Sequence, residues 1–459
     1  MKDQLMNIIA QVSGRDISRI SDQSRFSDDL GLDSINIIEI LTEVEDCFDL
    51  RFAPDEDDIG AIFYTVSSLW AHIADKKGIN VFLKKIMQDV YARRNPLSEE
   101  LKTVVRTERV NGGILCEVWF MTRGCCHDME GGCVMCNYGK GMLVEHEEII
   151  GQLRDRFDRL PQGLRELVIN PSGSFLDDRE VPPPLRSTIL ALLKDMPFQT
   201  LTVESRADVL SLHALQELKN SLDNKEIFIE IGVESLNPWL LRNCINKGLA
   251  IESIFTAVAQ IHSLGMQAIA NIGLGIPFIS ESANIIDAAA SIHKAFEMGF
   301  DQVVLFPYHV KPGTLLEELY ALKMYRCVSL WSLIQVLLAL DGAKLAKTNI
   351  SWYRNNYTNK NKVLASPTTC THCEAQILGL LDDYRDSPGS LSLERLANLE
   401  CACYEDWHQE RINEPQGIVF DDVLNGYRAL AKVFNVDGDL LERELNHMKT
   451  ALEACHANH

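Results

Sequence analysis

Hydrophobic and polar positions follow two different patterns along the chain. In residues 1–77, apolar residues recur with the helical period, as in Leu5, Ile9 and Val12. From about residue 113 to residue 325, short apolar runs alternate with amphipathic segments. The short runs predict strands at 114–122, 167–170, 200–204, 227–232, 268–275 and 302–306. Six strand–helix units in succession indicate parallel strands in a partial barrel.

The predicted fold class is therefore α/β, with four parts in chain order. These are a small all-α bundle at 1–77, a linker at 78–112, a partial (β/α)6 barrel at 113–325 and a mostly helical C-terminal region at 326–459. A chain of 459 residues is long enough for this organisation. In barrels of parallel strands, ligands bind at the carboxyl ends of the strands, so functional residues are expected there.

Composition and charge narrow the function classes. The chain has no run of about 18 uncharged apolar residues, so no membrane span is expected. Its start lacks the apolar core of a signal peptide, and its thirteen cysteines lie mostly in close sets; both favour a reducing, cytoplasmic location. A net charge of −21 argues against a large nucleic-acid interface.

The N-terminal part contains a candidate modification site. Gly31-Leu32-Asp33-Ser34-Ile35 opens the second periodic segment, with Asp33 or Ser34 as the helix N-cap. A serine hydroxyl at a helix N-terminus favours an attached phosphodiester, because the free N–H groups and the helix dipole attract negative charge. The alternative is that Ser34 only caps a helix of a small acidic bundle.

The span 1–77 resembles an acyl carrier protein, which is a four-helix bundle, and the five residues from Gly31 match its attachment motif. The resemblance implies that Ser34 carries 4′-phosphopantetheine. It also implies two partners: a phosphopantetheinyl transferase, and an enzyme that loads an acyl or aminoacyl group. The acidic helix that follows Ser34 resembles the face on which carrier proteins dock their partner enzymes.

A second candidate site follows the first predicted strand of the barrel. Cys125, Cys133 and Cys136 lie within twelve residues, and three thiolates on an iron–sulfur cluster leave one iron open to another molecule. Cys126 is an alternative to Cys125. A zinc site made of Cys126, Cys133, Cys136 and His127 also fits the residue types.

This cysteine loop resembles that of the radical S-adenosylmethionine (SAM) enzymes, although the spacing Cys125-x7-Cys133-x2-Cys136 departs from their usual Cys-x3-Cys-x2-Cys. The resemblance implies that the three cysteines hold a 4Fe–4S cluster that binds SAM. Reductive cleavage of SAM then gives a 5′-deoxyadenosyl radical, with one electron from a flavodoxin- or ferredoxin-like donor.

The same resemblance assigns roles to residues at later strand ends. SAM is expected to contact seven of them: Gly173, Ser174, Glu204, Arg206, Glu234, Ser235 and Asn271. A structural ion pair between Glu204 and Arg206 is the alternative for those two. His309 and Lys311, after the sixth strand, are expected to face substrate, although loop histidines more often have a structural role.

The motifs GSFLD, ESR, GVES and GIPFISE occur in the order found in the radical SAM subunit of archaeosine synthase. This resemblance covers about residues 110–410. That family cleaves a lysine-derived adduct on a modified tRNA base. The carrier-like segment and the acidic charge of this chain do not fit that substrate.

The C-terminal region contains a further cysteine set, Cys370-x2-Cys373 and Cys401-x-Cys403. Two close pairs suit either one zinc ion or an auxiliary iron–sulfur cluster, and free thiols are the third possibility.

The sequence thus predicts a radical SAM enzyme that transforms an acyl or aminoacyl group on its own carrier domain, in specialised-metabolite biosynthesis. A covalent tether gives a small substrate a high effective concentration. One alternative is a tRNA-base-modifying lyase of the archaeosine synthase type. Another is a non-catalytic carrier with a cluster-bearing scaffold. No residue is identified as an acid or base for later steps.

Overall fold

The structure is a computed structural model that describes residues 2–48, 50–53, 57–95, 102–110, 113–355 and 363–457. The chain divides into two compact units, Met1–Val81 and Phe82–His459. Each unit has its own hydrophobic core. Among the described helices, none combines the length and the apolar composition needed to cross a membrane.

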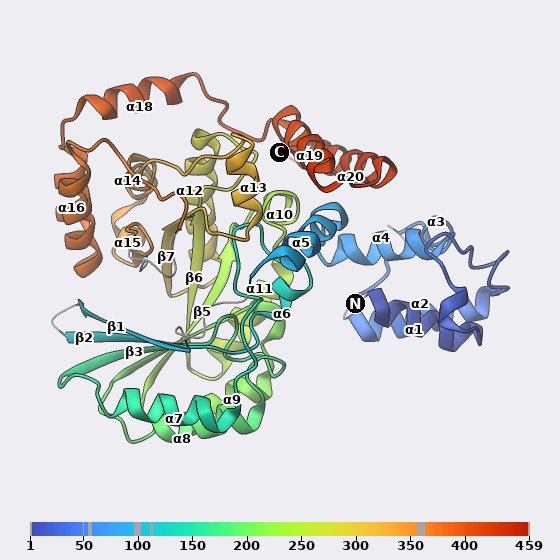
Figure 1. The fold of residues 1–459 in the computed structure, drawn as a ribbon, viewed down its shortest axis with the longest axis horizontal. Coiled ribbons are helices and arrows are strands. Elements are labelled where there is room, and N and C mark those ends of the chain that lie inside the picture. The colour runs from blue at the N-terminus through green and yellow to red at the C-terminus, as the bar shows by residue number, and fades with distance from the viewer. Residues whose placement is uncertain are drawn as a thin grey trace. The chain divides into compact units, whose positions relative to one another are not determined.

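The first unit is a helical bundle, drawn in blue in Figure 1. Its elements are α1 (Lys2–Ser13), the short η1 (Ile17–Arg19), α2 (Ser34–Phe48), α3 (Ile59–Ile62) and α4 (Val66–Lys76). Leu5, Ile9, Ile40 and Val44 are fully buried in its core. They are the positions that the helical period brings to one face of α1 and of α2. The small all-α bundle predicted from the sequence is confirmed.

The second unit is built on an eight-stranded sheet whose strand order is the chain order (Figure 1). The strands are β1 (Thr103–Val110), β2 (Gly113–Phe120), β3 (Leu164–Asn170), β4 (Thr200–Ser205), β5 (Glu226–Glu234), β6 (Gln267–Leu274), β7 (Gln302–Pro307) and β8 (Thr348–Ile350). β1 pairs antiparallel with β2, and all later neighbours are parallel. The predicted α/β partial barrel is confirmed, and the six predicted strands are β2 to β7.

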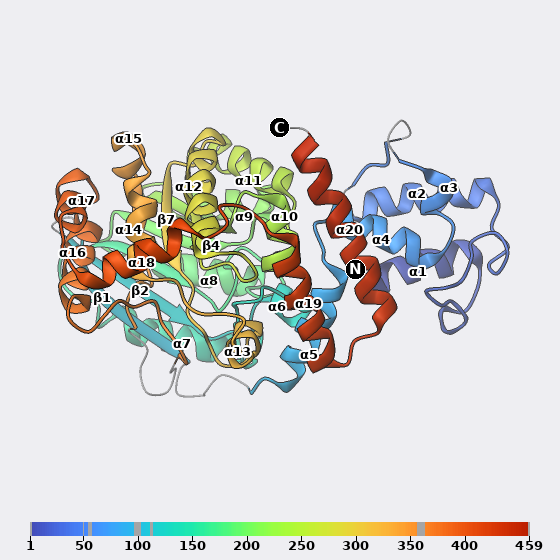
Figure 2. The same ribbon diagram turned by 90° about the horizontal axis from the view of Figure 1, so that it is seen from above.

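Helices cover the outer face of the curled sheet (Figures 1 and 2). They are α7 (His146–Phe157), α8 (Pro183–Leu193), α9 (Leu212–Ser221), α11 (Ile251–Ser263), α12 (Glu281–Glu297) and α14 (Leu330–Leu338). Alternate strand residues such as Leu201 and Val203 pack in the core beneath these helices. The residues between them, such as Thr202 and Glu204, therefore face the concave side of the sheet, here called the lumen.

Short helical elements connect the strands and helices: α6 (Cys126–Met129), η3 (Ala207–Val209), α10 (Pro238–Leu240), η4 (Leu241–Ile245), α13 (Leu315–Ala321) and α15 (Gly342–Leu345). The C-terminal region is helical, as predicted, with α16 (Glu374–Asp386), α17 (Ser390–Ala397), α18 (Ala402–Ile412), α19 (Phe420–Phe434) and α20 (Gly438–Ala457).

The segment 78–112, expected to be a linker, contributes two elements to the second unit. One is β1, and the other is α5 (Val81–Arg93). The apolar side chains of α5 share a core with Cys133 and Met135 of the cysteine loop and with α19 and α20. This segment therefore supports the loop that contains the candidate cluster ligands.

Candidate functional site

The cysteine loop after β2 is held from two sides by buried polar contacts. Asp128 is 2% exposed and pairs with Arg94, the residue that follows α5, with 2.5 Å between Nη1 and Oδ2. On the other side, Asn246 follows η4, and its side-chain amide donates to the carbonyl oxygens of Gly131 and Gly132 at 2.8 and 2.9 Å. These contacts fix the loop backbone just before Cys133, at the carboxyl ends of the strands.

The three candidate ligands have contrasting surroundings. A hydrogen bond from the Cys136 thiol holds the pKa of Cys133 well below its usual range, and the same contact raises that of Cys136. Burial raises the pKa of Cys125 to about 12 and that of Cys126 to about 11. The guanidinium of Arg206 lies near Cys125 and Cys133, whereas Cys126 faces Asp177 and Arg179.

Glu180 ties the cysteine loop to the loop after β3. Its carboxylate accepts hydrogen bonds from Thr122 Oγ1 at 2.6 Å and from the backbone N–H groups of Gly173 and Ser174 at 2.9 and 2.7 Å. Burial raises its pKa to about 7. A Cβ at Gly173 would lie 2.7 Å from Cys125 Cβ, so only glycine allows the two loops to approach this closely.

Several buried polar atoms at the strand ends have no hydrogen-bond partner. Asn170 accepts from the Glu204 backbone N–H at 2.6 Å, but its Nδ2 has no partner. The same holds for Ser172 Oγ, Ser205 Oγ and Asn271 Oδ1. Buried polar groups are normally satisfied, and these lie at the ends of β3 and β4 and within β6. The region therefore fits a polar ligand such as SAM, and the three cysteines fit an iron–sulfur cluster.

Arg206 and Glu234, both expected to contact SAM, are engaged by protein groups. Arg206 forms a two-pronged pair with Asp208 at 2.9 and 3.0 Å and donates to the Lys247 carbonyl oxygen. Glu234 pairs with Lys247 Nζ at 3.0 Å and accepts from Tyr308 OH at 3.1 Å. The alternative ion pair between Glu204 and Arg206 is wrong, since Asp208 takes that position.

Ser235, His309 and Lys311, the other residues expected to contact SAM or substrate, lie in three different surroundings. Ser235 is fully buried and hydrogen bonds to Asp287 of α12 and to the Asn237 backbone. His309 is 3% exposed and bonds Ser366 Oγ at 3.0 Å and the Trp352 carbonyl, and burial lowers its pKa to about 4. Lys311 donates to Tyr138 OH at 3.0 Å beside the cysteine loop.

The lumen contains Glu204, which was expected to contact SAM, and two carboxylates that the sequence analysis did not select, Glu230 and Glu117. Glu204 of β4 lies directly opposite Glu230 of β5, and Glu117 of β2 is close enough to raise the pKa of both. Burial is the main cause: it raises the pKa of Glu204 well above its ordinary value and that of Glu230 to about 7. The signal in the sequence was an acidic residue at an inward position of an apolar strand.

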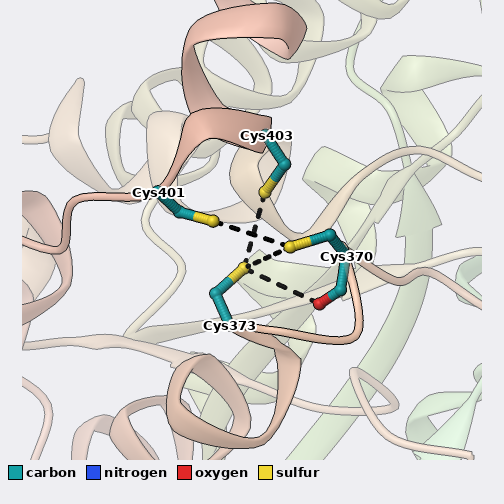
Figure 3. A group of neighbouring side chains, drawn as sticks. All are labelled: Cys370, Cys373, Cys401 and Cys403. Atoms are coloured by element: carbon teal, nitrogen blue, oxygen red, sulfur yellow. Dashed lines mark hydrogen bonds between the residues drawn. The ribbon is translucent and has the colours of Figure 1, made fainter.

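The C-terminal cysteines converge in space (Figure 3). Their sulfurs all lie within 4.8 Å of one another, with 3.6 Å between Cys370 and Cys373, 3.5 Å between Cys370 and Cys401, and 3.5 Å between Cys373 and Cys403. In the described part of the chain, this is the single group of three or more Cys, His, Asp or Glu side chains that is so close. Among the described residues, neither the alternative zinc set around His127 nor the set of Cys125, Cys133 and Cys136 is brought this close together.

In the first unit, the structure decides the cap of α2. Asp33 Oδ1 accepts from the backbone N–H groups of Ile35 and Asn36 at 2.9 and 3.1 Å, so Asp33 is the N-cap. Ser34 is the first helical residue and is exposed. The neighbouring Ile35 and Ile38 are 72% and 63% exposed, so an apolar surface lies beside Ser34.

Known proteins resemble both the N-terminal segment and a larger part of the chain. Residues 3–56 match the family model "Phosphopantetheine attachment site". The acyl carrier protein of Chlorobium phaeovibrioides is 42% identical over 57 residues, which cover 12% of this chain and 72% of that one. MJ0550 of Methanocaldococcus jannaschii is 31% identical over 262 residues, 55% of this chain and 67% of that protein. The chain belongs to the MJ0550 family and carries an acyl carrier protein domain.

A second relative of this MJ0550-family chain is the archaeosine synthase subunit beta of Methanosarcina acetivorans. It is 27% identical over 340 residues, which cover 72% of this chain and 94% of the relative. Among solved structures, Methanocaldococcus infernus Elp3 has 16% identity and a TM-score of 0.40, covering 57% of this chain and 60% of that one. The resemblances to acyl carrier proteins and to the archaeosine synthase subunit are confirmed.

Proposed function

We propose that this chain is a radical SAM enzyme acting on an aminoacyl group that phosphopantetheine tethers to Ser34. The observation that carries the proposal is one chain with an exposed attachment serine and a cysteine loop at the strand ends of a partial barrel. When bound, the 4Fe–4S cluster and SAM supply a 5′-deoxyadenosyl radical, which abstracts a hydrogen atom. The chain's own residues position both groups.

Cys125, Cys133 and Cys136 are the proposed cluster ligands. Cys125 is preferred to Cys126 because Arg206 lies near both Cys125 and Cys133. Lys247 also lies near Cys133, so two cations offset the charge of the thiolates. Glu180 also joins Thr122, at the start of the cysteine loop, to the backbone of Gly173 and Ser174, and these three contacts use no sulfur atom.

Polar groups at the ends of β3, β4 and β6 are proposed to bind SAM. Asn170, Ser172 and Asn271 offer the buried atoms that lack protein partners. Gly173 and Ser174 contribute backbone close to Cys125. Arg206 and Glu234 act by holding Lys247 and the η4 turn beside the cluster loop, since their own polar atoms are engaged.

The lumenal carboxylates favour an aminoacyl group over an uncharged acyl group. Glu204 and Glu230 lie side by side, and burial raises the pKa of both. A buried carboxylate is stabilised by a cation or by hydrogen-bond donors. An ammonium group between them supplies both, and the open Asn271 Oδ1 adds a further acceptor. We therefore propose that the tethered group carries a positive charge.

Three partners follow from this proposal. A phosphopantetheinyl transferase modifies Ser34, and a loading enzyme then attaches the aminoacyl group. The exposed Ile35 and Ile38 give these enzymes an apolar contact beside the serine. A flavodoxin- or ferredoxin-like protein supplies the electron for SAM cleavage.

The test uses the full chain, reconstituted without oxygen and supplied with SAM and dithionite. We expect the chain without substitutions to form 5′-deoxyadenosine and the Cys133→Ala variant to form none. Ser34→Ala is expected to keep its cluster but to lose turnover linked to the carrier. Cys47→Ser is the matched control, since Cys47 is an exposed free cysteine far along the chain from the loop. Undiminished SAM cleavage in Cys133→Ala would refute the cluster assignment.

A second candidate function is supported by the archaeosine synthase relative, whose similarity covers 72% of this chain. In that case the substrate is a modified tRNA base, and the carrier domain has a separate role. Binding of tRNA with a steep dependence on salt would favour this function. Equal activity of Ser34→Ala on a tRNA substrate would establish it over the tethered one.

A further inference from the structure

The distances among the C-terminal cysteines discriminate between the two kinds of metal centre. Zinc binds thiolates at about 2.3 Å, so a regular tetrahedron places its sulfurs about 3.8 Å apart. Three sulfur pairs lie 3.5 to 3.6 Å apart, close to this value, and all four sulfurs lie within 4.8 Å of one another. In a four-iron cluster, each thiolate binds a different iron at a corner, which spreads the sulfurs farther apart.

The surroundings of the four thiols also fit a closed, thiolate-bound ion. The Cys373 backbone N–H donates to the Cys370 sulfur, and the Cys403 backbone N–H donates to the Cys401 sulfur. Trp331 Nε1 donates to Cys403 Sγ at 3.4 Å. Such donors stabilise metal-bound thiolates and fix their orientation. Cys373 is 2% exposed, and all four cysteines are free thiols in the structure.

We infer that Cys370, Cys373, Cys401 and Cys403 hold one zinc ion that positions helix α18 on the barrel. The ion has four protein ligands and no open position, so it is structural rather than catalytic. It joins the loop before α16 to the start of α18, two segments about thirty residues apart in sequence. This inference does not depend on the proposed substrate.

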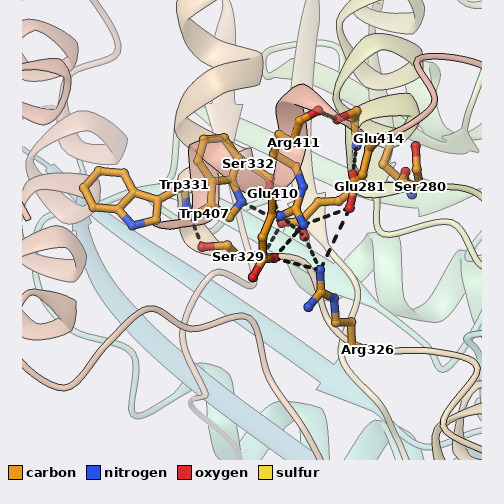
Figure 4. A network of polar contacts seen from close by, with 12 residues as sticks. Ser280, Glu281, Arg326, Ser329, Trp331, Ser332, Trp407, Glu410, Arg411 and Glu414 are labelled. Atoms are coloured by element: carbon orange, nitrogen blue, oxygen red, sulfur yellow. Dashed lines mark hydrogen bonds and ion pairs between the residues drawn. The ribbon is translucent and has the colours of Figure 1, made fainter. Parts of the chain in front are cut away.

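Helix α18, which starts at this centre, reaches a buried carboxylate on the barrel (Figure 4). Glu281 opens α12, and its side chain is 7% exposed. It accepts hydrogen bonds from Trp407 Nε1 at 3.1 Å and from Arg411 Nη1 at 2.8 Å, both on α18. It also accepts from the Ser329 backbone N–H at 2.7 Å. A buried carboxylate with several donors fixes the register of α18 against α12.

The consequence reaches the loop after β6, the strand that contains the proposed SAM-contacting residue Asn271. Asn284, one turn into α12, accepts from the backbone N–H groups of Gly275 and Ile276 at 3.0 and 2.6 Å. The start of α12 therefore holds this loop from one side, and α18 holds the start of α12. The link to SAM binding rests on the proposed function, whereas the metal assignment does not.

The first experiment is metal analysis of the full chain after anaerobic reconstitution with iron, sulfide and zinc. We expect one zinc and four irons per chain. Cobalt(II) in place of zinc should give the visible absorption bands of a tetrahedral thiolate site. Eight irons per chain would overturn the inference in favour of a second cluster. Four freely alkylated C-terminal thiols in the metal-replete chain would overturn it in favour of no metal.

Variants test the structural consequence. Cys403→Ser is expected to lose the zinc and keep the four irons, with Cys47→Ser as the exposed control. Hydrogen exchange should then rise in α18 and in residues 275–279, and it should rise there without loss of zinc in Glu281→Gln. If Cys403→Ser does not fold, metal analysis of the unmodified chain still decides the ion. Unchanged exchange in a zinc-free chain would overturn the positioning role alone.

Discussion

Replacing Gly173 with alanine tests the proposed arrangement of the cluster loop most sharply. A Cβ at this position would lie 2.4 Å from Glu180 Oε2 and 2.7 Å from Cys125 Cβ. Carbon atoms in contact lie about 3.5–4.0 Å apart, so the cysteine loop has to move by about 1 Å. Gly173→Ala is therefore expected to displace Cys125 from its place against the loop after β3.

The magnitude follows from the cost of overpacking. Inserting a methyl group into a packed site costs about 1–3 kcal/mol, which is about a 5- to 150-fold change in an equilibrium. If that cost falls on the cluster-binding form of the loop, the affinity for the cluster falls by this factor. The assay is iron and sulfide content after anaerobic reconstitution, followed by titration of the cluster with a chelator.

Gly151→Ala is the matched control for this prediction. Gly151 lies in the middle of α7, and a Cβ there meets no atom within 4 Å. Alanine favours a helix interior over glycine by about 0.5–1 kcal/mol, so the control should be slightly more stable and bind a full cluster. Full cluster content and unchanged chelator sensitivity in Gly173→Ala would refute the close approach of Cys125.

Three further predictions address charge, packing and capping. Burial raises the pKa of Glu230 to about 7, above the ordinary 4.5 of a glutamate, so this carboxyl is mostly neutral below pH 7 and binds a cation only when ionised. The single-turnover rate of the loaded chain should therefore fall about fivefold from pH 7 to pH 6, and Glu230→Gln should abolish this dependence. Asp128→Leu leaves the buried guanidinium of Arg94 unpaired and should cost about 3–5 kcal/mol, seen as loss of the cluster and as faster hydrogen exchange in α5; an unaltered cluster would contradict it. Asp33→Ala should weaken α2 by about 0.5–2 kcal/mol, measured by hydrogen exchange in the full chain, whereas Asp33→Asn should keep the cap.

The sheet could be predicted from the sequence because its strands are short apolar runs with helices between them. All six predicted strands occur, with ends shifted by up to three residues. β1 was missed because its charged residues, such as Arg106 and Glu108, hide the apolar alternation of an edge strand. β8 has three residues, which is too short for a pattern. Both need tertiary contacts to form.

Site residues that lie within one short sequence motif could be predicted, whereas the roles of residues that depend on a hydrogen-bond or strand partner far along the chain could not. The cysteine loop and Gly173 lie at the expected strand ends, and Asp33 caps α2 beside Ser34. The pairing of Arg206 with Asp208 and the burial of His309 depend on neighbours that no local pattern reveals. The lumenal Glu230 was missed because its role comes from register across strands.

For the C-terminal cysteines too, the sequence predicts that a metal site exists but does not predict its geometry. The sequence indicated a metal site from the two close pairs, and the structure brings all four sulfurs together. The choice between zinc and an auxiliary cluster depends on sulfur separations, which spacing along the chain does not fix.

Transfer of deuterium from the carrier arm tests the central claim most directly. The protein is loaded with its natural group in a host grown on deuterated medium, then given unlabelled SAM and reductant without oxygen. We predict deuterium at the 5′ carbon of 5′-deoxyadenosine, or of SAM where it is regenerated, and none from the equally deuterated Ser34→Ala chain. Unlabelled 5′-deoxyadenosine from a chain whose arm is loaded would contradict the account, because the radical would then act on something other than the tethered group.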